Sequence, residues 1–344
     1  MTVPYLVRRQ HLISAGKLGL LGASSVSLSM NLLANAQTAM PNENLAYKDV
    51  RFYNSATKRE LFVRIRIPTS AKKAGLIIYS PGLGSGLNNG APWCDAWQKF
   101  GFVVVTISHP VTNEDIWDTS QKSFKINLQN ALAPDQYGLR VSDCKYVITQ
   151  CLSDDYLKSI LDPEKIGIAG HSYGALTVQS ICGQNGGVLV DPRIKAAIAL
   201  SPTARSKEAA QAAFKSVTMP FLCITGDHDG HVTFKYKSDS MRLGIDQVHR
   251  LHVYEGLPRG QKQQLILANA DHMSFAGELI DADRFSRDIE VQEGSERKIW
   301  NEISQVSTEF WVEFLDQKNK PKDLKKYEQK IRSYLRVGDE LKLG

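Results

Sequence analysis

Short runs of apolar residues recur along the chain, separated by stretches in which apolar residues repeat every three or four positions. Several runs, such as residues 102–105, lack polar alternation, which is typical of strands covered on both faces. Residues 141–151 and 299–314 instead show helical spacing. The expected strands are residues 48–54, 61–68, 75–80, 102–107, 165–169, 196–200, 221–225, 251–254 and 264–268.

Strands that alternate with helices predict an α/β fold with a mostly parallel central sheet and helices on both faces. A short polar turn at residues 55–60 joins the first two strands, which predicts an antiparallel hairpin at one edge of the sheet. The sequence has no long Gly/Ser or Pro linker and no internal repeat, so residues 37–344 are expected to form a single domain. Residues 111–133 and 203–217 are interpreted as insertions that could form a cap.

The first 36 residues differ from the rest of the chain. Arg8 and Arg9 precede a weakly apolar run over residues 18–33, and Ala34-Asn35-Ala36 has the form of a signal-peptidase site. This pattern predicts a twin-arginine signal peptide over residues 1–36, and therefore a periplasmic or secreted bacterial protein. The alternative, an uncleaved membrane anchor, is less favoured because the run is shorter than a spanning helix.

The net charge and the cysteine content indicate which classes of ligand the protein is not expected to bind. The formal net charge is +6, and residues 1–36 carry three of the positive charges and no negative one, so their removal leaves +3. This value is too small to indicate nucleic-acid binding, and stable membrane insertion is not expected either. The five cysteines form no C-x-x-C pair, so a zinc or redox site built on cysteine is not expected.

A candidate nucleophile follows the apolar strand at residues 165–169. Gly170-His171-Ser172-Tyr173-Gly174 stands between that strand and a helix-forming stretch that begins at Ala175. Nucleophilic serines of this type need a tight strand-to-helix turn, and the two glycines leave room where side chains would clash. Ser172 is therefore the predicted nucleophile. The alternative is a structural glycine-rich turn.

A serine hydroxyl needs a base, and the base needs an acid that orients it. For a serine on such a turn the chain order is serine, then acid, then histidine. His272 fits best, because it follows the apolar strand at residues 264–268 within a short loop. The acid is expected after the strand at residues 221–225, where Asp227 and Asp229 both occur; we favour Asp229.

The same loop also raises the question of a metal site. Asp227, His228, Asp229 and His231 stand close together in the sequence, and carboxylates and imidazoles bind metal ions. A strand-end loop that carries the acid explains this cluster more simply. We therefore expect no metal ion at this loop.

Acyl transfer also needs backbone N–H donors for the negative oxygen that develops. One donor is expected from Tyr173, the residue after the nucleophile, and the other from the loop after the strand at residues 75–80. That loop, Ser80-Pro81-Gly82-Leu83-Gly84, is rich in glycine. The Leu83 N–H is assigned as the second donor, and an ordinary glycine turn is the alternative.

Four motifs in this order resemble the α/β-hydrolase superfamily, and within it the branch of platelet-activating-factor acetylhydrolase and dienelactone hydrolase. They are Ser80–Gly84, Ser108-His109-Pro110, Gly170–Gly174 and Asp271-His272-Met273-Ser274-Phe275. The resemblance implies an ester hydrolase without metal or organic cofactor. It also implies a triad of Ser172, Asp229 and His272, with oxyanion amides from Leu83 and Tyr173.

These observations together predict a serine esterase that acts through an acyl-enzyme on a small-molecule or lipid-like ester. An amidase or peptidase with the same triad is the nearest alternative. A non-catalytic binding protein with a hydrolase fold is the alternative from another class. The acyl and alcohol groups of the substrate and the oligomeric state do not follow from the sequence.

Overall fold

The computed structural model describes residues 47–120, 122–237, 239–260, 262–279, 281–287, 289–290, 294–315 and 323–344. The expected signal peptide, residues 1–36, lies outside the described residues. Within the described ranges, none of the helices combines the length and the apolar character needed to span a bilayer.

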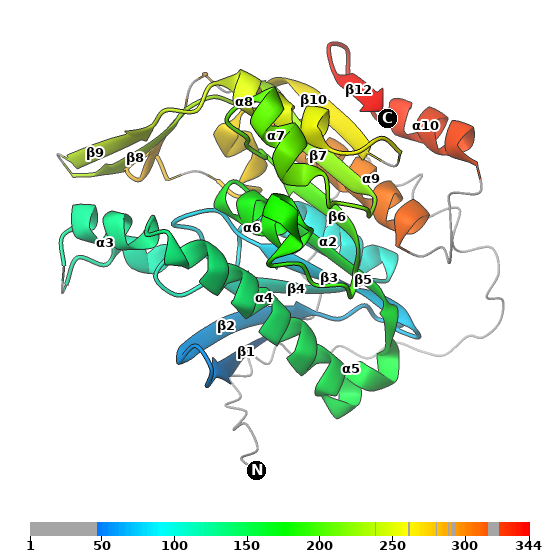
Figure 1. Cartoon of the computed structure of the whole chain (residues 1–344), viewed down its shortest axis with the longest axis horizontal. Coiled ribbons are helices and arrows are strands. Elements are labelled where there is room, and N and C mark those ends of the chain that lie inside the picture. Colours follow the sequence, from blue (N-terminus) through cyan, green and yellow to red (C-terminus); the bar gives the residue numbers. More distant parts are fainter. Residues whose placement is uncertain are drawn as a thin grey trace, which may run out of the picture.

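The centre of the molecule is a nine-stranded sheet with the order β1-β2-β4-β3-β5-β6-β7-β10-β12 (Figure 1). Strands β4, β3, β5, β6, β7 and β10 run parallel, and β1 and β2 form the predicted antiparallel hairpin at one edge. The strand bounds are β1 Tyr47–Asn54, β2 Arg59–Arg66, β3 Ala74–Ser80, β4 Val103–Ser108, β5 Leu161–His171, β6 Ile194–Leu200, β7 Phe221–His228, β10 Lys262–Asp271 and β12 Glu340–Leu343.

Helices cover both faces of this sheet, and alternate residues of each strand pack against one layer or the other. In β3, Leu76 and Ile78 belong to the core beneath α4, α6 and α8, whereas Ile77 and Tyr79 belong to the core beneath α2 and α9. The helix bounds are α2 Ala91–Phe100, α3 Phe124–Ala131, α4 Asp135–Ser153, α5 Asp155–Ile160, α6 Tyr173–Ile181, α7 Lys207–Phe214, α8 Gln247–Gly256, α9 Ser295–Phe314 and α10 Leu324–Arg332. The predicted α/β-hydrolase architecture is confirmed.

A third apolar cluster lies beside the main sheet. A small sheet of order β11-β8-β9 pairs β11 Phe285–Ser286, β8 Val232–Tyr236 and β9 Asp239–Leu243. Its aromatic side chains pack against Trp117 and Phe124, and Trp117 stacks on Phe124 with ring centroids 5.2 Å apart. Residues 111–133 thus contribute to a separate aromatic cluster that also contains Leu83 and Tyr173. In Figure 1 this unit projects to the left, where α3 faces the hairpin of β8 and β9.

The second expected insertion, residues 203–217, is built differently. It contains α7, whose Ala210 and Phe214 are fully buried in the main core. Helix α7 packs along α8, where the position of Gly256 would place a Cβ only 2.5 Å from Ala210. This segment is therefore part of the helical layer on the sheet.

The predicted strand at residues 251–254 is wrong, because these residues lie within helix α8. The buried positions Arg250, Val253 and Gly256 are spaced three residues apart, which places them on one face of a helix. The His249 Nδ1 accepts a hydrogen bond from the Asp246 N–H at 3.1 Å and so caps the first turn. A run of four mixed residues was too short to separate a strand from a helix.

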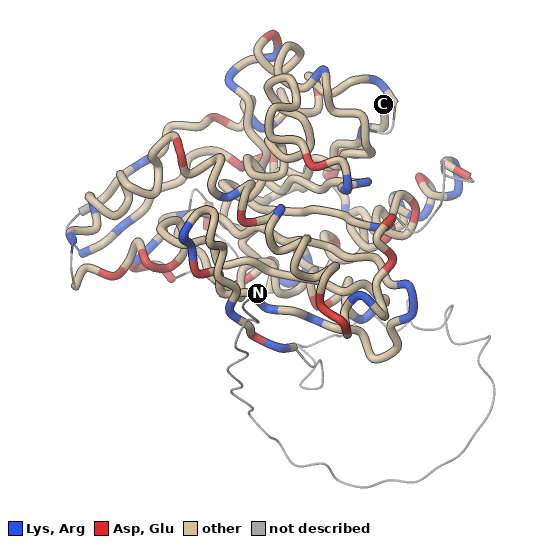
Figure 2. The backbone as a smooth tube through the Cα atoms, turned by 60° about the horizontal axis from the view of Figure 1, so that its bottom comes forward, with Lys and Arg blue, Asp and Glu red and all other residues tan. Residues whose placement is uncertain are grey.

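Charged residues of both signs are spread along the described chain (Figure 2). All five cysteines are buried and free: Cys94, Cys144, Cys151, Cys182 and Cys223. Burial raises the pKa of each of these thiols. They act as apolar packing residues in the two cores of the sheet.

Candidate active site

Ser172 lies on a sharp turn between β5 and α6. Its backbone has φ 54° and ψ −113°, a strained conformation for a residue with a side chain. The turn is held by the Ser172 N–H, which donates to the Leu200 carbonyl at 3.0 Å. A Cβ at Gly174 would lie 1.8 Å from the Ser80 carbonyl oxygen, and one at Gly170 would lie 2.6 Å from the Gly174 backbone. Only glycine allows this close approach at both positions.

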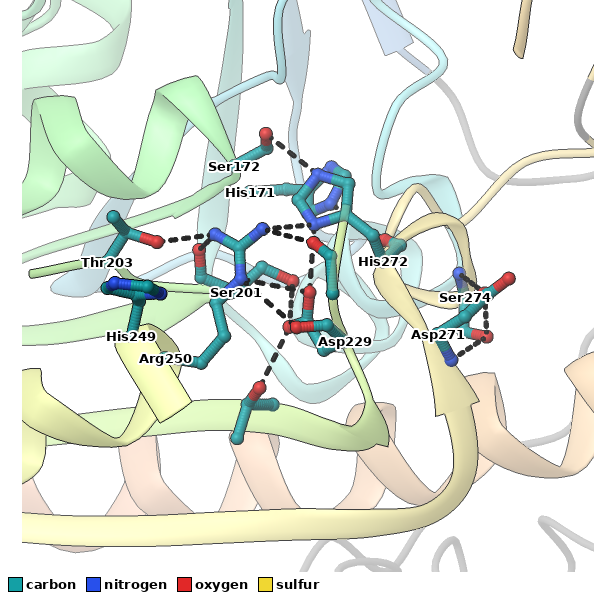
Figure 3. Close-up of polar contacts among 12 residues, drawn as sticks. His171, Ser172, Ser201, Thr203, Asp229, His249, Arg250, Asp271, His272 and Ser274 are labelled. Atoms are coloured by element: carbon teal, nitrogen blue, oxygen red, sulfur yellow. Dashed lines mark hydrogen bonds and ion pairs between the residues drawn. The ribbon is translucent and has the colours of Figure 1, made fainter. Parts of the chain in front are cut away.

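His272 approaches Ser172 from the carboxyl end of β10. Its Nε2 lies 2.9 Å from the Ser172 Oγ, although the two residues are 100 positions apart in the chain (Figure 3). The imidazole is buried, whereas the Ser172 side chain is partly exposed. The serine is therefore open to a ligand from solvent while the imidazole next to it is shielded.

Asp229 completes the chain of hydrogen bonds. Its Oδ1 lies 2.9 Å from the His272 Nδ1, and its Oδ2 accepts hydrogen bonds from Ser201 Oγ at 2.6 Å and Thr225 Oγ1 at 2.8 Å. Asp227 points elsewhere, because its carboxylate contacts His228 and the Ala270 N–H. The structure therefore brings Asp229 to His272, and not Asp227.

Nothing in the local sequence indicates a role for Arg250, because its place depends on how α8 packs. The guanidinium is buried, with Nε 3.1 Å from Asp229 Oδ1 and Nη2 3.0 Å from His272 Nδ1 (Figure 3). It also donates to the Ser201 carbonyl and to Thr203 Oγ1. Arginine has only donors, so Arg250 Nη2 forms no hydrogen bond with His272 Nδ1 when that nitrogen carries a proton. Asp229 then accepts the imidazole N–H, and Arg250 is held by Asp229, Ser201 and Thr203.

These contacts set the charge states of the site. Burial alone would raise the pKa of Asp229, but the Arg250 charge and the hydrogen bond from His272 outweigh it and hold that pKa far below its usual range. Burial and then the Arg250 charge lower the pKa of His272, although Asp229 acts in the opposite direction. At neutral pH the site therefore holds an ionised carboxylate and a neutral imidazole whose Nε2 can accept a proton.

The loop that carries His272 is anchored on both sides. The Asp271 carboxylate does not face the site; it accepts hydrogen bonds from the Ser274 N–H and hydroxyl and from Arg287. On the other side, His171 Nε2 lies 3.1 Å from the His272 carbonyl oxygen, and the two imidazole rings are 4.9 Å apart. These contacts hold the backbone that carries the His272 ring.

The loop after β3 lies against the nucleophile. A Cβ at Gly82 would lie 3.6 Å from the Ser172 Cβ, so the loop passes next to the serine. Among the described residues, neither the Leu83 N–H nor the Tyr173 N–H has a hydrogen-bond acceptor. The two amides proposed from the sequence are thus free to bind a ligand oxygen. The neighbouring Gly84 N–H, in contrast, donates to the Thr112 carbonyl at 2.9 Å.

The residues at the strand-end loop do not assemble a metal centre. Among the residues that the structure describes, no group of three or more His, Cys, Asp or Glu side chains could hold a metal ion. His231 instead faces Asp246, with Nε2 3.6 Å from a carboxylate oxygen.

The comparison with protein families agrees with this geometry. Residues 93–250 match the family model described as serine hydrolase (FSH1), and this range includes Ser172, Asp229 and Arg250. The chain is a serine hydrolase of the α/β-hydrolase superfamily. No curated protein matches the sequence. The closer resemblance of this α/β-hydrolase to the platelet-activating-factor acetylhydrolase and dienelactone hydrolase branch stays a prediction.

Proposed function

We propose that this α/β-hydrolase cleaves carboxylic esters through an acyl-enzyme, with Ser172 as nucleophile, His272 as base and Asp229 as the orienting acid. The observation that carries the proposal is the continuous path from a partly exposed hydroxyl through a buried imidazole to a buried carboxylate, with both contacts at 2.9 Å. Such a path activates a serine for attack on a carbonyl carbon.

In the first half of the reaction, the Ser172 Oγ forms a bond to the ester carbonyl carbon as its proton moves to His272 Nε2. The Asp229 carboxylate stabilises the resulting imidazolium. The Leu83 and Tyr173 N–H groups donate to the oxyanion of the tetrahedral intermediate. When the intermediate collapses, the C–O bond to the alcohol breaks and the alcohol leaves with the proton from His272.

In the second half, water gives a proton to His272 Nε2 and attacks the acyl carbon. Collapse of the second intermediate releases the carboxylic acid and returns the proton to Ser172. The alcohol takes the proton that Ser172 gave up, and water replaces it by way of His272, so the proton transfers balance without a cofactor. Its substrate is a small-molecule or lipid-like ester, and it involves no nucleic acid.

Hydrolysis of a short-chain aryl ester tests this proposal. Ser172→Ala should lower kcat/KM by about 10⁴-fold or more with an unchanged circular dichroism spectrum. Ser180→Ala, on the same helix α6, is the matched control and should hydrolyse the ester at the wild-type rate. Retained turnover in Ser172→Ala would refute the assignment. Faster cleavage of an amide with the same acyl group would instead favour an amidase.

We also propose that residues 1–36 direct export by the twin-arginine route. The support is the arginine pair and the terminal Ala34-Asn35-Ala36. Replacement of Arg8 and Arg9 by lysine should retain the protein in the bacterial cytoplasm, and the exported wild-type protein should begin at Gln37. Export of the double lysine variant would contradict this route.

A further inference from the structure

A second Ser–His–Asp array lies beneath the loop after β3. His109 Nε2 is 3.0 Å from Ser80 Oγ, and His109 Nδ1 is 2.9 Å from Asp143 Oδ2. Unlike Ser172, all three of these side chains are buried, with at most 1% of any exposed. This array cannot receive a substrate from solvent. Any role in the reaction therefore depends on the neighbouring groups to which it is hydrogen-bonded.

The direction of each hydrogen bond follows from the donors available. Burial and then the Arg140 charge lower the pKa of His109 to about 4, so its imidazole is neutral at neutral pH. The carboxylate of Asp143 only accepts, so His109 Nδ1 carries the proton and Nε2 accepts from the Ser80 hydroxyl. The Ser80 oxygen in turn accepts from Arg140 Nη2 at 2.9 Å. The Ser80 hydroxyl therefore donates to His109 and accepts from Arg140.

The hydrogen-bonded array ends at Arg140, whose guanidinium donates to the Ser80 hydroxyl. The guanidinium is buried and reaches from α4 to Thr177 on α6, and the two helices lie side by side in Figure 1. Nη2 donates to the Pro81 carbonyl at 2.6 Å as well as to Ser80, and Nη1 donates to Thr112 Oγ1 at 2.6 Å. Nε donates to Thr177 Oγ1 on α6 at 3.0 Å.

These contacts join the two elements that carry the free amides. The Pro81 carbonyl belongs to the peptide unit just before the one that carries the Leu83 N–H. On α6, Thr177 Oγ1 donates to the Tyr173 carbonyl at 3.1 Å, and the guanidinium lies over the Tyr173 ring at 4.8 Å. A single rigid side chain therefore fixes the position of one donor loop relative to the other.

We propose that Arg140 is a positioning residue of the oxyanion hole, and that Ser80, His109 and Asp143 hold its guanidinium in place. This inference rests on the proposed function, because it assumes that the Leu83 and Tyr173 amides bind an oxyanion. If a donor N–H moves by a fraction of an ångström, its hydrogen bond to the oxyanion becomes weaker. This loss is largest in the transition state, because the negative charge on the oxygen is largest there.

The guanidinium also contributes a charge. The Asp143 carboxylate is bonded to Arg59 and His109, and no described carboxylate lies within salt-bridge distance of Arg140. A buried cation behind the Pro81 peptide favours negative charge on that side of the loop. Lysine at position 140 would keep this charge but could not match the planar set of four donor contacts.

Kinetics of Arg140→Lys and Ser80→Ala on the aryl ester test the proposal. We expect kcat to fall by about 10²-fold in Arg140→Lys and about 10-fold in Ser80→Ala, because each loosens an oxyanion donor. KM should change by less than about threefold. The affinity for a trifluoromethyl ketone, which forms a tetrahedral adduct, should fall by the same factor as kcat in each variant.

Ser307→Ala is the matched control for Ser80→Ala. Ser307 lies on α9, is fully buried and accepts a hydrogen bond from Trp97 Nε1 at 2.8 Å, and its hydrogen bonds are to Trp97 and Ser304 and not to the proposed catalytic groups. It should lower the thermal midpoint while leaving kcat unchanged. Should Arg140→Lys fail to fold, the isosteric Ser80→Ala still decides the question.

Unchanged kcat in folded Ser80→Ala and Arg140→Lys would overturn the inference, as would a loss confined to KM. In both cases the wild-type enzyme would still hydrolyse the ester and Ser172→Ala would still be inactive, so the proposed function would stand. A wild-type protein that hydrolyses no ester or amide would overturn both proposals together.

Discussion

The molecule contains two Ser–His–Asp arrays with nearly the same hydrogen-bond lengths and different surroundings. In the first array the two contacts are both 2.9 Å, and in the second they are 3.0 Å and 2.9 Å. Ser172 stands on a strained turn and is partly exposed, whereas Ser80 ends strand β3 and is fully buried. The same three residue types thus leave the serine accessible to a substrate in the first array and form a buried structural contact in the second.

The position of the arginine separates the two arrays further. Arg250 contacts the acid end of the first array, at Asp229 and His272, and leaves the serine oxygen free for attack. Arg140 contacts the serine end of the second array and occupies the oxygen of Ser80. The Ser172 oxygen is therefore open to a substrate, whereas the Ser80 oxygen is buried and already accepts a hydrogen bond from Arg140.

Replacement of the histidine in each array should give the largest contrast. His272→Ala removes the proposed base and should lower kcat/KM by about 10⁴-fold or more. His109→Ala removes only a support of Arg140, so we expect a loss of about 10-fold to 100-fold together with a destabilisation of about 2 kcal/mol from the unpaired buried groups. Steady-state kinetics and urea unfolding measure both effects, and equal losses of activity would contradict the distinction.

The two aspartates of the strand-end loop give the next contrast. Asp229→Asn should lower kcat by about 10³-fold to 10⁴-fold, because the amide cannot hold the required tautomer of His272. Asp227→Asn should retain activity within about threefold, since Asp227 is half-exposed and contacts His228. A reversed order of the two variants would assign the acid to Asp227.

A smaller and pH-dependent effect is expected from Arg250→Gln. The charges that act on the pKa of His272 are those of Arg250, Asp229 and Asp271, although the Asp271 carboxylate points away from the ring, and the neutral His171 ring lies beside it. Arg250 lowers the pKa of His272, so its removal should raise that pKa. Because the reaction needs neutral His272, the acidic limb of kcat/KM should move to higher pH.

The profile of kcat/KM against pH measures this shift, with Arg193→Gln as the control. Arg193 pairs with Asp191 in a separate ion pair and should leave the limb in place. If the acidic limb of Arg250→Gln keeps the wild-type position or moves to lower pH, Arg250 does not lower the pKa of His272.

The sequence predicts most of the fold because buried parallel strands are continuous apolar runs, as in β3 and β4. It misses β12 because Glu340–Leu343 is short and its apolar pattern is weak; it becomes a strand by antiparallel pairing with β10. It also misses the small sheet, although Val232 and Phe234 alternate with less buried residues in β8. That alternation was a usable signal.

The residues of the candidate site also differ in whether the sequence predicts them. Ser172, His272 and Asp229 could be selected because the chain order and the strand ends restrict where such groups meet. Arg250 and Arg140 could not, because each reaches its partners from a helix whose rotation and packing the local sequence does not specify. The sequence also predicts a strand at residues 251–254 in place of helix α8, and it is from this helix that Arg250 reaches Asp229.

Peptide mapping after reaction with a fluorophosphonate shows which serine is the nucleophile. We expect an adduct on the tryptic peptide of residues 166–193, which fragmentation assigns to Ser172 rather than Ser180, and no adduct at Ser80 in the peptide of residues 74–99. An unlabelled Ser172 in the folded protein, or an adduct at Ser80, would show that Ser172 is not the accessible nucleophile of this fold.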